Sequence, residues 1–162
     1  MNGGSSKSLL PLVEILISIG IFAIAVVLTL QLFLLARFLG DKTSDTAKAI
    51  FEVQNVAENI KTFKTSGDAE IYINDNFKAG TKSMYSLYYD EEWNLTDTIE
   101  KASFVMEINM NKDEYNSGEL YNFKLEFYKT EPYPFIDDKK TEVNKEYIPL
   151  LASADASKFI LK

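Results

Sequence analysis

The chain has 162 residues, a formal net charge of −7 at pH 7, and neither histidine nor cysteine. This length allows one domain, or one domain with an appendage. Without cysteine the chain has no disulfide, thiol nucleophile or thiolate metal ligand, and without histidine it lacks the commonest general base and metal ligand. These absences argue against an ordinary hydrolase or zinc enzyme, so we expect a non-enzymatic protein with no metal site and no cofactor.

Hydrophobic residues are concentrated in Ile15–Ala36, a run of 22 positions without a charged side chain. A helix of this length reaches about 33 Å, which is enough to cross the roughly 30 Å hydrocarbon core of a bilayer. The run is too long for a secretory signal peptide, and Arg37-Phe-Leu-Gly offers no small-residue cleavage site. We therefore predict a transmembrane helix at residues 10–37 that stays attached to the chain.

One acidic residue, Glu14, directly precedes this uncharged run. It can lie at the membrane interface, where the N-terminal end of a helix favours negative charge. It can also lie within the membrane and pair with a cation from another chain, because an acid in lipid needs a partner. Physical chemistry alone leaves both interpretations of Glu14 open.

Residues 7–24, Lys-Ser-Leu-Leu-Pro-Leu-Val-Glu-Ile-Leu-Ile-Ser-Ile-Gly-Ile-Phe-Ala-Ile, resemble the N-terminal segment of type IV pilins and type II secretion pseudopilins. In that family a prepilin peptidase removes a short basic leader after a Gly. A Glu at the fifth mature position then pairs with the free amine of a neighbouring subunit. The resemblance gives this assembly role to Glu14 and makes Leu10 the first mature residue, with Leu12 and Val13 next to Glu14 in the assembly segment.

The processing site differs from the family pattern. Leu9 stands where the family has the Gly before the cleaved bond, and Pro11 replaces the usual small polar residue. Pro11 is compatible with the first turn of a helix, where its missing N–H is not needed. Leu9 and Leu10 mark the position of leader processing if it occurs, and we expect an uncleaved, minor or divergent member of the family.

The resemblance also implies partners and a location. The partners are other pilin-like subunits bound through the N-terminal helix, membrane lipid, a prepilin peptidase and an assembly platform. The location is a bacterial cell membrane, with residues 1–9 as a leader-like cytoplasmic N-terminus and the C-terminal domain extracytoplasmic. Counting Lys7 against Arg37, Lys42 and Lys48 leans weakly towards the opposite orientation, and we follow the resemblance. From residue 38 onward the chain has 15 lysines and 23 acidic residues, so its net charge is negative. We therefore predict no nucleic-acid contact for this part.

A second helical pattern follows the membrane span. Apolar residues recur there at spacings of three and four with charged residues between them, which is typical of an amphipathic helix. They are Ile50, Val53, Val56 or Ala57, Ile60 and Phe63. Gly67 is a natural stop, so we predict an amphipathic extension at residues 38–66 with its helix ending near Thr65. Gly40-Asp41 is the expected place for a kink or a break.

Residues 67–162 are predicted to form a β-rich head. Apolar and polar residues alternate in 104–111 and 121–128, which predicts an antiparallel hairpin joined by a longer loop over 112–119. Further strands are expected at 82–89 and 146–151, and Pro149 limits the latter to an edge or an end. We expect a connecting loop at 68–80 and surface loops around 132–134 and 137–140. The predicted fold class is α+β and pilin-like, with a long N-terminal helix packed on a small antiparallel sheet.

Three groups of residues in the head are candidate sites. Asp90-Glu91-Glu92 could bind a cation, but a solvated turn is the favoured interpretation. Asn109, Asn111 and Asp113 have the first spacings of a calcium loop, but the required Gly and the final acid are missing. The aromatic residues of 85–93 are either a platform for a sugar or peptide or, as we favour, part of the core. These aromatics are Tyr85, Tyr88, Tyr89 and Trp93.

Two functions remain open from the sequence. The first is a non-enzymatic, membrane-anchored minor pilin or pseudopilin-like subunit, which assembles through its N-terminal helix into a pilus or secretion-type filament. The second is a single-pass anchor that carries an extracellular ligand-binding or sensory domain and does not assemble. The N-terminal motif favours the first.

Overall fold

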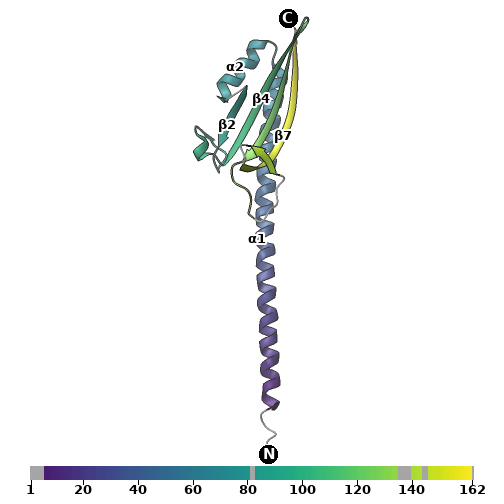
Figure 1. The fold of residues 1–162 in the computed structure, drawn as a ribbon, viewed down its shortest axis with the longest axis vertical. Coiled ribbons are helices and arrows are strands. Elements are labelled where there is room, and N and C mark those ends of the chain that lie inside the picture. The colour runs from purple at the N-terminus through teal and green to yellow at the C-terminus, as the bar shows by residue number, and fades with distance from the viewer. Residues whose placement is uncertain (1–5, 81–82, 135–139, 144–145, 162) are drawn as a thin grey trace, which may run out of the picture. The chain divides into compact units, whose positions relative to one another are not determined.

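A computed structural model describes residues 6–80, 83–134, 140–143 and 146–161 of the chain. The chain divides into two compact units, Met1–Gly40 and Asp41–Lys162. Helix α1 spans Ser6–Thr62 and therefore contributes to both units (Figure 1). It continues without a break through Gly40-Asp41, which is compatible with the cost of about 1 kcal/mol for a single glycine in a long helix. The division into units nevertheless falls between these two residues.

The second unit has an α+β fold, which confirms the predicted fold class. Its seven described strands follow the order β1-β2-β4-β5-β7-β6, with β3 beside β2, and every neighbouring pair among them is antiparallel. The strands are β1 (Lys78–Ala79), β2 (Met84–Tyr89), β3 (Leu95–Thr96), β4 (Phe104–Tyr115), β5 (Gly118–Lys129), β6 (Lys140–Val143) and β7 (Glu146–Leu161). Helix α2 (Ser66–Asn76) and the short 3-10 helix η1 (Ile99–Lys101) complete the described elements.

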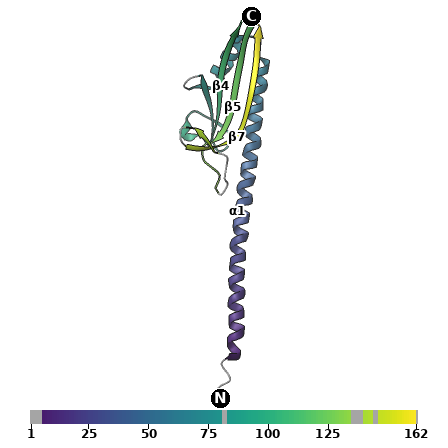
Figure 2. The same ribbon diagram turned by 45° about the vertical axis from the view of Figure 1, so that its right-hand side comes forward.

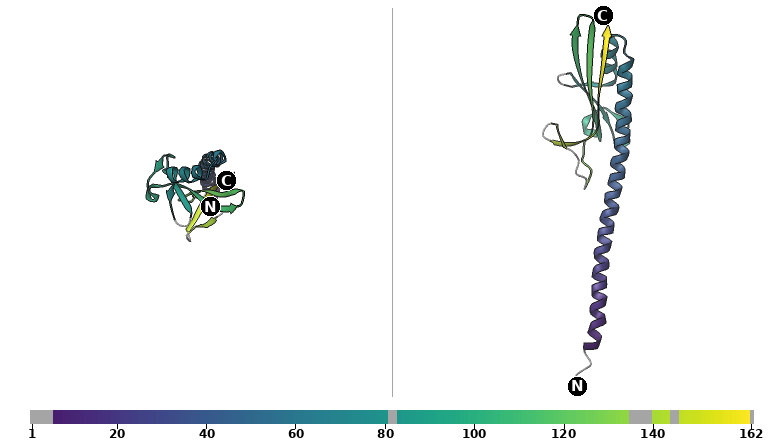
Figure 3. Two further views of the ribbon diagram at one scale, coloured as in Figure 1. Left: turned by 90° about the horizontal axis from the view of Figure 1, so that it is seen from above. Right: turned by 90° about the vertical axis from the view of Figure 1, so that its right-hand side faces the viewer.

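The core of this unit lies between the helices and one face of the sheet. Figure 2 and the right-hand view of Figure 3 show the long strands running beside the part of α1 that belongs to this unit. The helix contributes Ala49, Val53, Val56 and Ile60, all at most 6% exposed. The two central strands bury the alternating residues that the sequence predicted, Phe104, Met106 and Ile108 on β4 and Tyr121, Phe123, Leu125 and Phe127 on β5.

Ile50 is the exception in the predicted helical stripe. Its side chain is 43% exposed, and Ala49 is fully buried in its place. Ala49, Val53, Val56 and Ile60 follow spacings of four, three and four, so they share one face of the helix. Ile50 lies about 100° around the helix from Ala49 and faces away from the sheet.

The predicted loop at 68–80 is wrong, because α2 occupies Ser66–Asn76. Thr65 caps this helix: its hydroxyl accepts a hydrogen bond from the Asp68 N–H, and the Asp68 carboxylate accepts one from the Thr65 N–H at 2.9 Å. This reciprocal capping box satisfies backbone N–H groups that the first turn leaves unpaired. Helix α1 accordingly ends at Thr62, three residues before the predicted end.

The sheet is also more extensive than predicted. Strands β4 and β5 pair from Phe104↔Lys129 to Tyr115↔Gly118, so only Asn116 and Ser117 form the loop that was predicted over residues 112–119. In this paired polar end, Lys112 forms an ion pair of 2.9 Å with Glu119 on the partner strand. Strand β7 continues to Leu161, ten residues past the predicted end. The sequence did not predict this part because alanine alternates there with polar residues and gives little apolar signal.

Pro149 lies where β7 changes partners. It is opposite Lys140 on β6, whereas pairing with β5 begins only at Leu150, opposite Tyr128. Proline therefore stands at the end of the long β5–β7 ladder, where it removes no N–H from that ladder. This position agrees with the predicted limit on Pro149. Of the predicted strand at 82–89, Met84–Tyr89 forms β2, Ser83 lies in a turn before it, and Lys82 lies outside the described residues.

Candidate functional site

The first unit presents apolar side chains on every side of its helix. Phe22, Leu32 and Phe33 are 71%, 68% and 69% exposed, and the other large apolar side chains between Leu12 and Leu35 are exposed as well. A helix that is apolar all round belongs in a protein core or in a membrane. Among the described residues, α1 is the helix that is long and apolar enough to cross a bilayer.

Glu14 lies in this helix with an exposed side chain, between the exposed side chains of Val13 and Ile15. The Glu14 carbonyl accepts a hydrogen bond of 2.8 Å from the Ser18 hydroxyl, one turn further along. No ion pair of the described residues includes the Glu14 carboxylate. Leu12, another predicted assembly residue, is 57% exposed. Leu9 and Leu10 are helical, and their side chains lie outside the described part of the structure.

In the second unit a partly buried polar cluster connects α1 to the sheet. The Asp45 carboxylate accepts a hydrogen bond of 2.6 Å from the Tyr133 hydroxyl and forms an ion pair of 2.9 Å with Lys129. The Lys129 ammonium also lies 4.5 Å from the centre of the Phe104 ring. Burial, reinforced by the bond to Asp45, raises the pKa of the Tyr133 hydroxyl well above its usual value. The cluster keeps the hydroxyl protonated and provides both charges with partners.

The acidic turn at Asp90 follows β2 and places Trp93 against the core. The Asp90 carboxylate accepts hydrogen bonds of 2.9 Å from the N–H groups of Glu92 and Asn94. Trp93 between them has a φ of 68° and stacks on Phe104, with ring centres 4.4 Å apart. The turn therefore uses its first carboxylate to fix the backbone, which agrees with the predicted solvated turn.

The aromatic residues of 85–93 do not gather into one exposed platform. Tyr89 is 6% exposed and belongs to the core, and Tyr85 and Trp93 pack against that core. Tyr88 is opposite Val105 and therefore points to the other face of the sheet. The core interpretation is confirmed for Tyr85, Tyr89 and Trp93.

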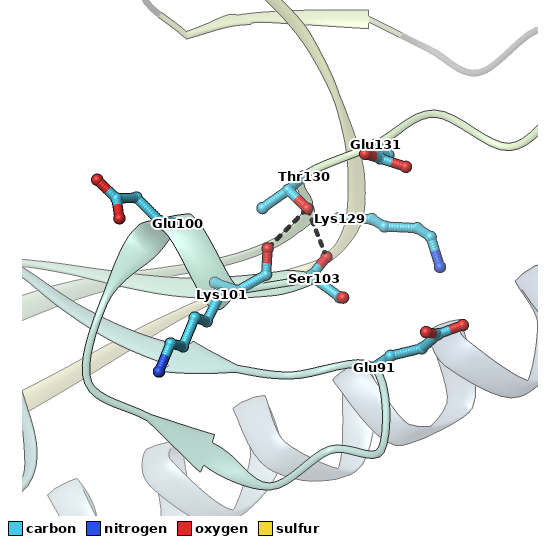
Figure 4. A pocket seen from close by; sticks show the side chains of 8 residues that line it. Glu91, Glu100, Lys101, Ser103, Lys129, Thr130 and Glu131 are labelled. Atoms are coloured by element: carbon cyan, nitrogen blue, oxygen red, sulfur yellow. Dashed lines mark hydrogen bonds between the residues drawn. The ribbon is translucent and has the colours of Figure 1, made fainter.

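A polar pocket of about 350 Å³ lies beside η1. It is lined by Glu91, Glu100, Lys101, Ala102, Ser103, Lys129, Thr130 and Glu131 (Figure 4). The Thr130 hydroxyl lies 3.0 Å from the carbonyl oxygens of Ala102 and Ser103, and Lys129 is paired with Asp45. The pocket thus offers carboxylates and one further lysine but no activated nucleophile. Among the described residues, no three His, Cys, Asp or Glu side chains come together to hold a metal ion.

Comparisons of the chain with protein-family models, with curated proteins and with solved structures gave no match. The function is therefore inferred from the residues of the chain and their geometry.

Sequence reasoning missed the cluster of Asp45, Lys129 and Tyr133. A signal for it was present, because Asp45 lies four residues before Ala49, on the buried face of the amphipathic helix. An acid on a buried face requires a cation or hydrogen-bond donors. Lys129 and Tyr133 lie 84 and 88 residues away in the sequence, so nothing local identified them as the partners.

Proposed function

We propose that the protein is a membrane-anchored, pilin-like structural subunit that assembles with sister subunits through its N-terminal helix. The exposed apolar surface of α1 between Leu12 and Leu35 carries this proposal. A plain membrane anchor also exposes apolar side chains to lipid. The additional feature here is Glu14, an acid next to the apolar run, whose carboxylate has no ion-pair partner among the described residues.

An unpaired carboxylate inside the hydrocarbon of a membrane is unfavourable, and its cost falls when a cation from another chain pairs with it. In the low dielectric of a helix bundle such an attraction is strong enough to select one register between neighbouring helices. Glu14 therefore acts as the register-setting residue, while Leu12 and Val13 pack against the helix of the neighbour. The proposed location is the bacterial cell membrane, with the second unit on the extracytoplasmic side.

The test uses the natural absence of cysteine. Single cysteines are placed at Leu12, at Val13 and at each position from Ile15 to Ser18 in the full-length protein. They are labelled in membranes of the native host with a thiol-reactive photocrosslinker, and crosslinked proteins are identified by mass spectrometry. Assembly predicts crosslinks to proteins that carry the same N-terminal pattern. The substitution Glu14→Gln keeps the size of the side chain but removes its charge, and it should abolish these crosslinks without reducing membrane insertion. Glu58→Gln, at an exposed position of the second unit, is the matched control.

The rival function makes the opposite prediction. A solitary anchor tolerates replacement of residues 9–36 by polyleucine and gives no specific crosslinks at any of these six cysteine positions. Unchanged crosslinking of the Glu14→Gln protein would show that Glu14 does not contribute to the interface. Absence of crosslinks in the cysteine variants that keep Glu14 would overturn the proposal of assembly.

A further inference from the structure

The two edges of the sheet in the second unit differ in their protection. One edge is covered by β1 and β3, which are two residues each and pair with β2. Lys78 on β1 forms an ion pair of 2.9 Å with Asp97, next to the end of β3, and so connects the two short strands. Short, charged edge strands of this kind prevent pairing with other chains.

The opposite edge is formed by β7, the yellow strand at the right-hand side of the sheet in Figure 1. From Ala152 to Leu161 this strand pairs with β5 on one side, and no described strand pairs with its other side. The single irregularity in the β5–β7 ladder falls between Phe127 and Tyr128, so these ten residues are regular.

The composition of this edge gives little protection against pairing. The segment Ala-Ser-Ala-Asp-Ala-Ser-Lys-Phe-Ile-Leu contains no proline and two charged residues. Every second residue of a strand directs its N–H and C=O groups away from its neighbour. The edge therefore presents a continuous row of donors and acceptors, which is the template used when a partner adds a strand.

Charge decides which strand fits. The Lys158 ammonium donates a hydrogen bond of 2.7 Å to the Lys61 carbonyl, so its charge is directed at the end of α1. Asp155 is exposed on the other face, beside Lys124, whose ammonium lies 2.8 Å from Glu126. Asp155 shares Lys124 with Glu126, and it is the exposed acidic side chain of this strand that a basic side chain on an added strand can reach. The excess of 23 acidic residues over 15 lysines after residue 37 disfavours an acidic partner, including a second copy of this chain.

We propose that the β7 edge from Ala152 to Leu161 binds an extended, neutral or basic segment of a different protein as an additional antiparallel strand. Antiparallel pairing matches every other pair in this sheet and is the more stable arrangement per residue. A basic side chain opposite Asp155 fixes the register of the added strand. This inference does not depend on the membrane helix, so it can fail while the proposed assembly holds.

The experiment measures binding of labelled decapeptides to the full-length protein in detergent micelles by fluorescence anisotropy. The probe alternates valine and threonine and carries two lysines. One control carries glutamates instead, and another is N-methylated along one edge. We expect the lysine peptide to bind about threefold to tenfold more tightly than the glutamate peptide, as cross-strand charge pairs allow, and the N-methylated peptide not to bind. Bound peptide should slow hydrogen exchange at alternate amides of Ala152–Leu161.

A charge reversal identifies the site. Asp155→Lys should make the glutamate peptide the tighter ligand, while Asp75→Lys on α2, which changes the total charge equally, should preserve the original preference. Equal binding of all peptides, or exchange that slows elsewhere, would overturn the proposal. A Ser157→Cys protein that forms disulfide-linked dimers in host membranes would also overturn it, because a second copy would then occupy the edge.

Discussion

The Tyr133 hydroxyl donates a hydrogen bond of 2.6 Å to Asp45, a residue 88 positions earlier in the chain. Lys129 binds the same carboxylate oxygen at 2.9 Å, and the side chains of Lys129 and Asp45 are 21% and 15% exposed. One carboxylate on α1 therefore holds both the end of β5 and the segment that follows it. Few other polar contacts in the described residues connect α1 with the sheet over so great a separation.

Replacing Asp45 should destabilise the second unit substantially. Asp45→Ala leaves the Lys129 charge without its partner and the buried Tyr133 hydroxyl without its acceptor, which together cost about 3 kcal/mol. The free energy of unfolding can be measured in urea from the fluorescence of Trp93, the single tryptophan of the chain. Adding Lys129→Met to Asp45→Ala should recover part of the loss, because the unpaired charge is then removed.

The Lys78–Asp97 pair provides the control for this prediction. Its two atoms are also 2.9 Å apart, but the Asp97 side chain is 99% exposed. Exposed ion pairs contribute little because water screens them, so Asp97→Asn should leave the unfolding curve unchanged. An Asp45→Ala protein as stable as the Asp97→Asn protein would show that the cluster of Asp45, Lys129 and Tyr133 does not hold the helix.

A like-charge pair on the other face of the sheet gives a second prediction. Glu107 and Glu126 are direct neighbours across β4 and β5. Burial, followed by repulsion from Glu126, raises the pKa of Glu107. The folded state therefore holds the Glu107 proton more tightly than the unfolded state, and stability falls as the pH rises from about 4.5 through the folded pKa.

Glu107→Gln removes that fall in stability. The variant should gain stability relative to the unsubstituted protein as the pH is raised from 4 to 7, ending about 0.5 kcal/mol ahead, the size of a cross-strand charge effect. Urea unfolding at a series of pH values measures this difference. Glu70→Gln on the exposed side of α2 should show no such trend. A constant difference across the pH range would mean that Glu107 titrates normally.

Glu119 should produce the opposite pH dependence. Hydrogen bonds from the Ser66 hydroxyl and the Lys112 ammonium lower the pKa of the Glu119 carboxyl to about 2. For a lowered acid, the stabilisation is complete above the unfolded value of about 4.5 and is lost as the pH falls towards 2. Glu119→Gln should flatten the loss of stability in this range, whereas Glu114→Gln on the same hairpin, with its more distant lysine contact of 3.6 Å, should not.

The fold could be predicted where a single periodicity repeated over many residues. The alternation in 104–111 and 121–128 identified β4 and β5, and spacings of three and four identified the soluble half of α1. Helix α2 was missed when a loop was predicted at 68–80, although Thr65 and Asp68 have the spacing of a capping box. The last ten residues of β7 were missed because alanine and serine carry little apolar contrast, so only pairing with β5 reveals the strand.

The candidate functional residues divide in the same way. Glu14 can be identified from the sequence because a single acidic side chain next to a long apolar run is rare and energetically costly in a membrane helix. The Asp45 cluster and the open β7 edge depend on contacts between residues far apart in the chain, and the sequence specifies neither partner. Burial of an acid predicts that a partner exists, but identifying Lys129 and Tyr133 requires the topology of the sheet.

The close approach of β5 and β7 at Gly118 gives the last prediction. A Cβ atom at Gly118 would lie 2.3 Å from the Ile160 carbonyl oxygen and 2.9 Å from the Phe159 ring. The ring of Phe159 can move, but the carbonyl belongs to the paired backbone of β7. Gly118→Ala therefore forces the strands apart at the start of their ladder, and it should destabilise the second unit by about 2 kcal/mol, within the range for overpacked sites.

Gly67→Ala is the matched control for this substitution. A Cβ at Gly67 meets only the Thr65 hydroxyl at 3.7 Å, and Gly67 lies in the first turn of α2. Alanine favours a helix over glycine by roughly 0.5–1 kcal/mol, so this variant should be slightly more stable than the unsubstituted protein. Because both substitutions add one methyl group, opposite signs of the change would locate the cost of Gly118→Ala in the contact with Ile160. If both variants are stabilised, β5 and β7 have room to separate at this end.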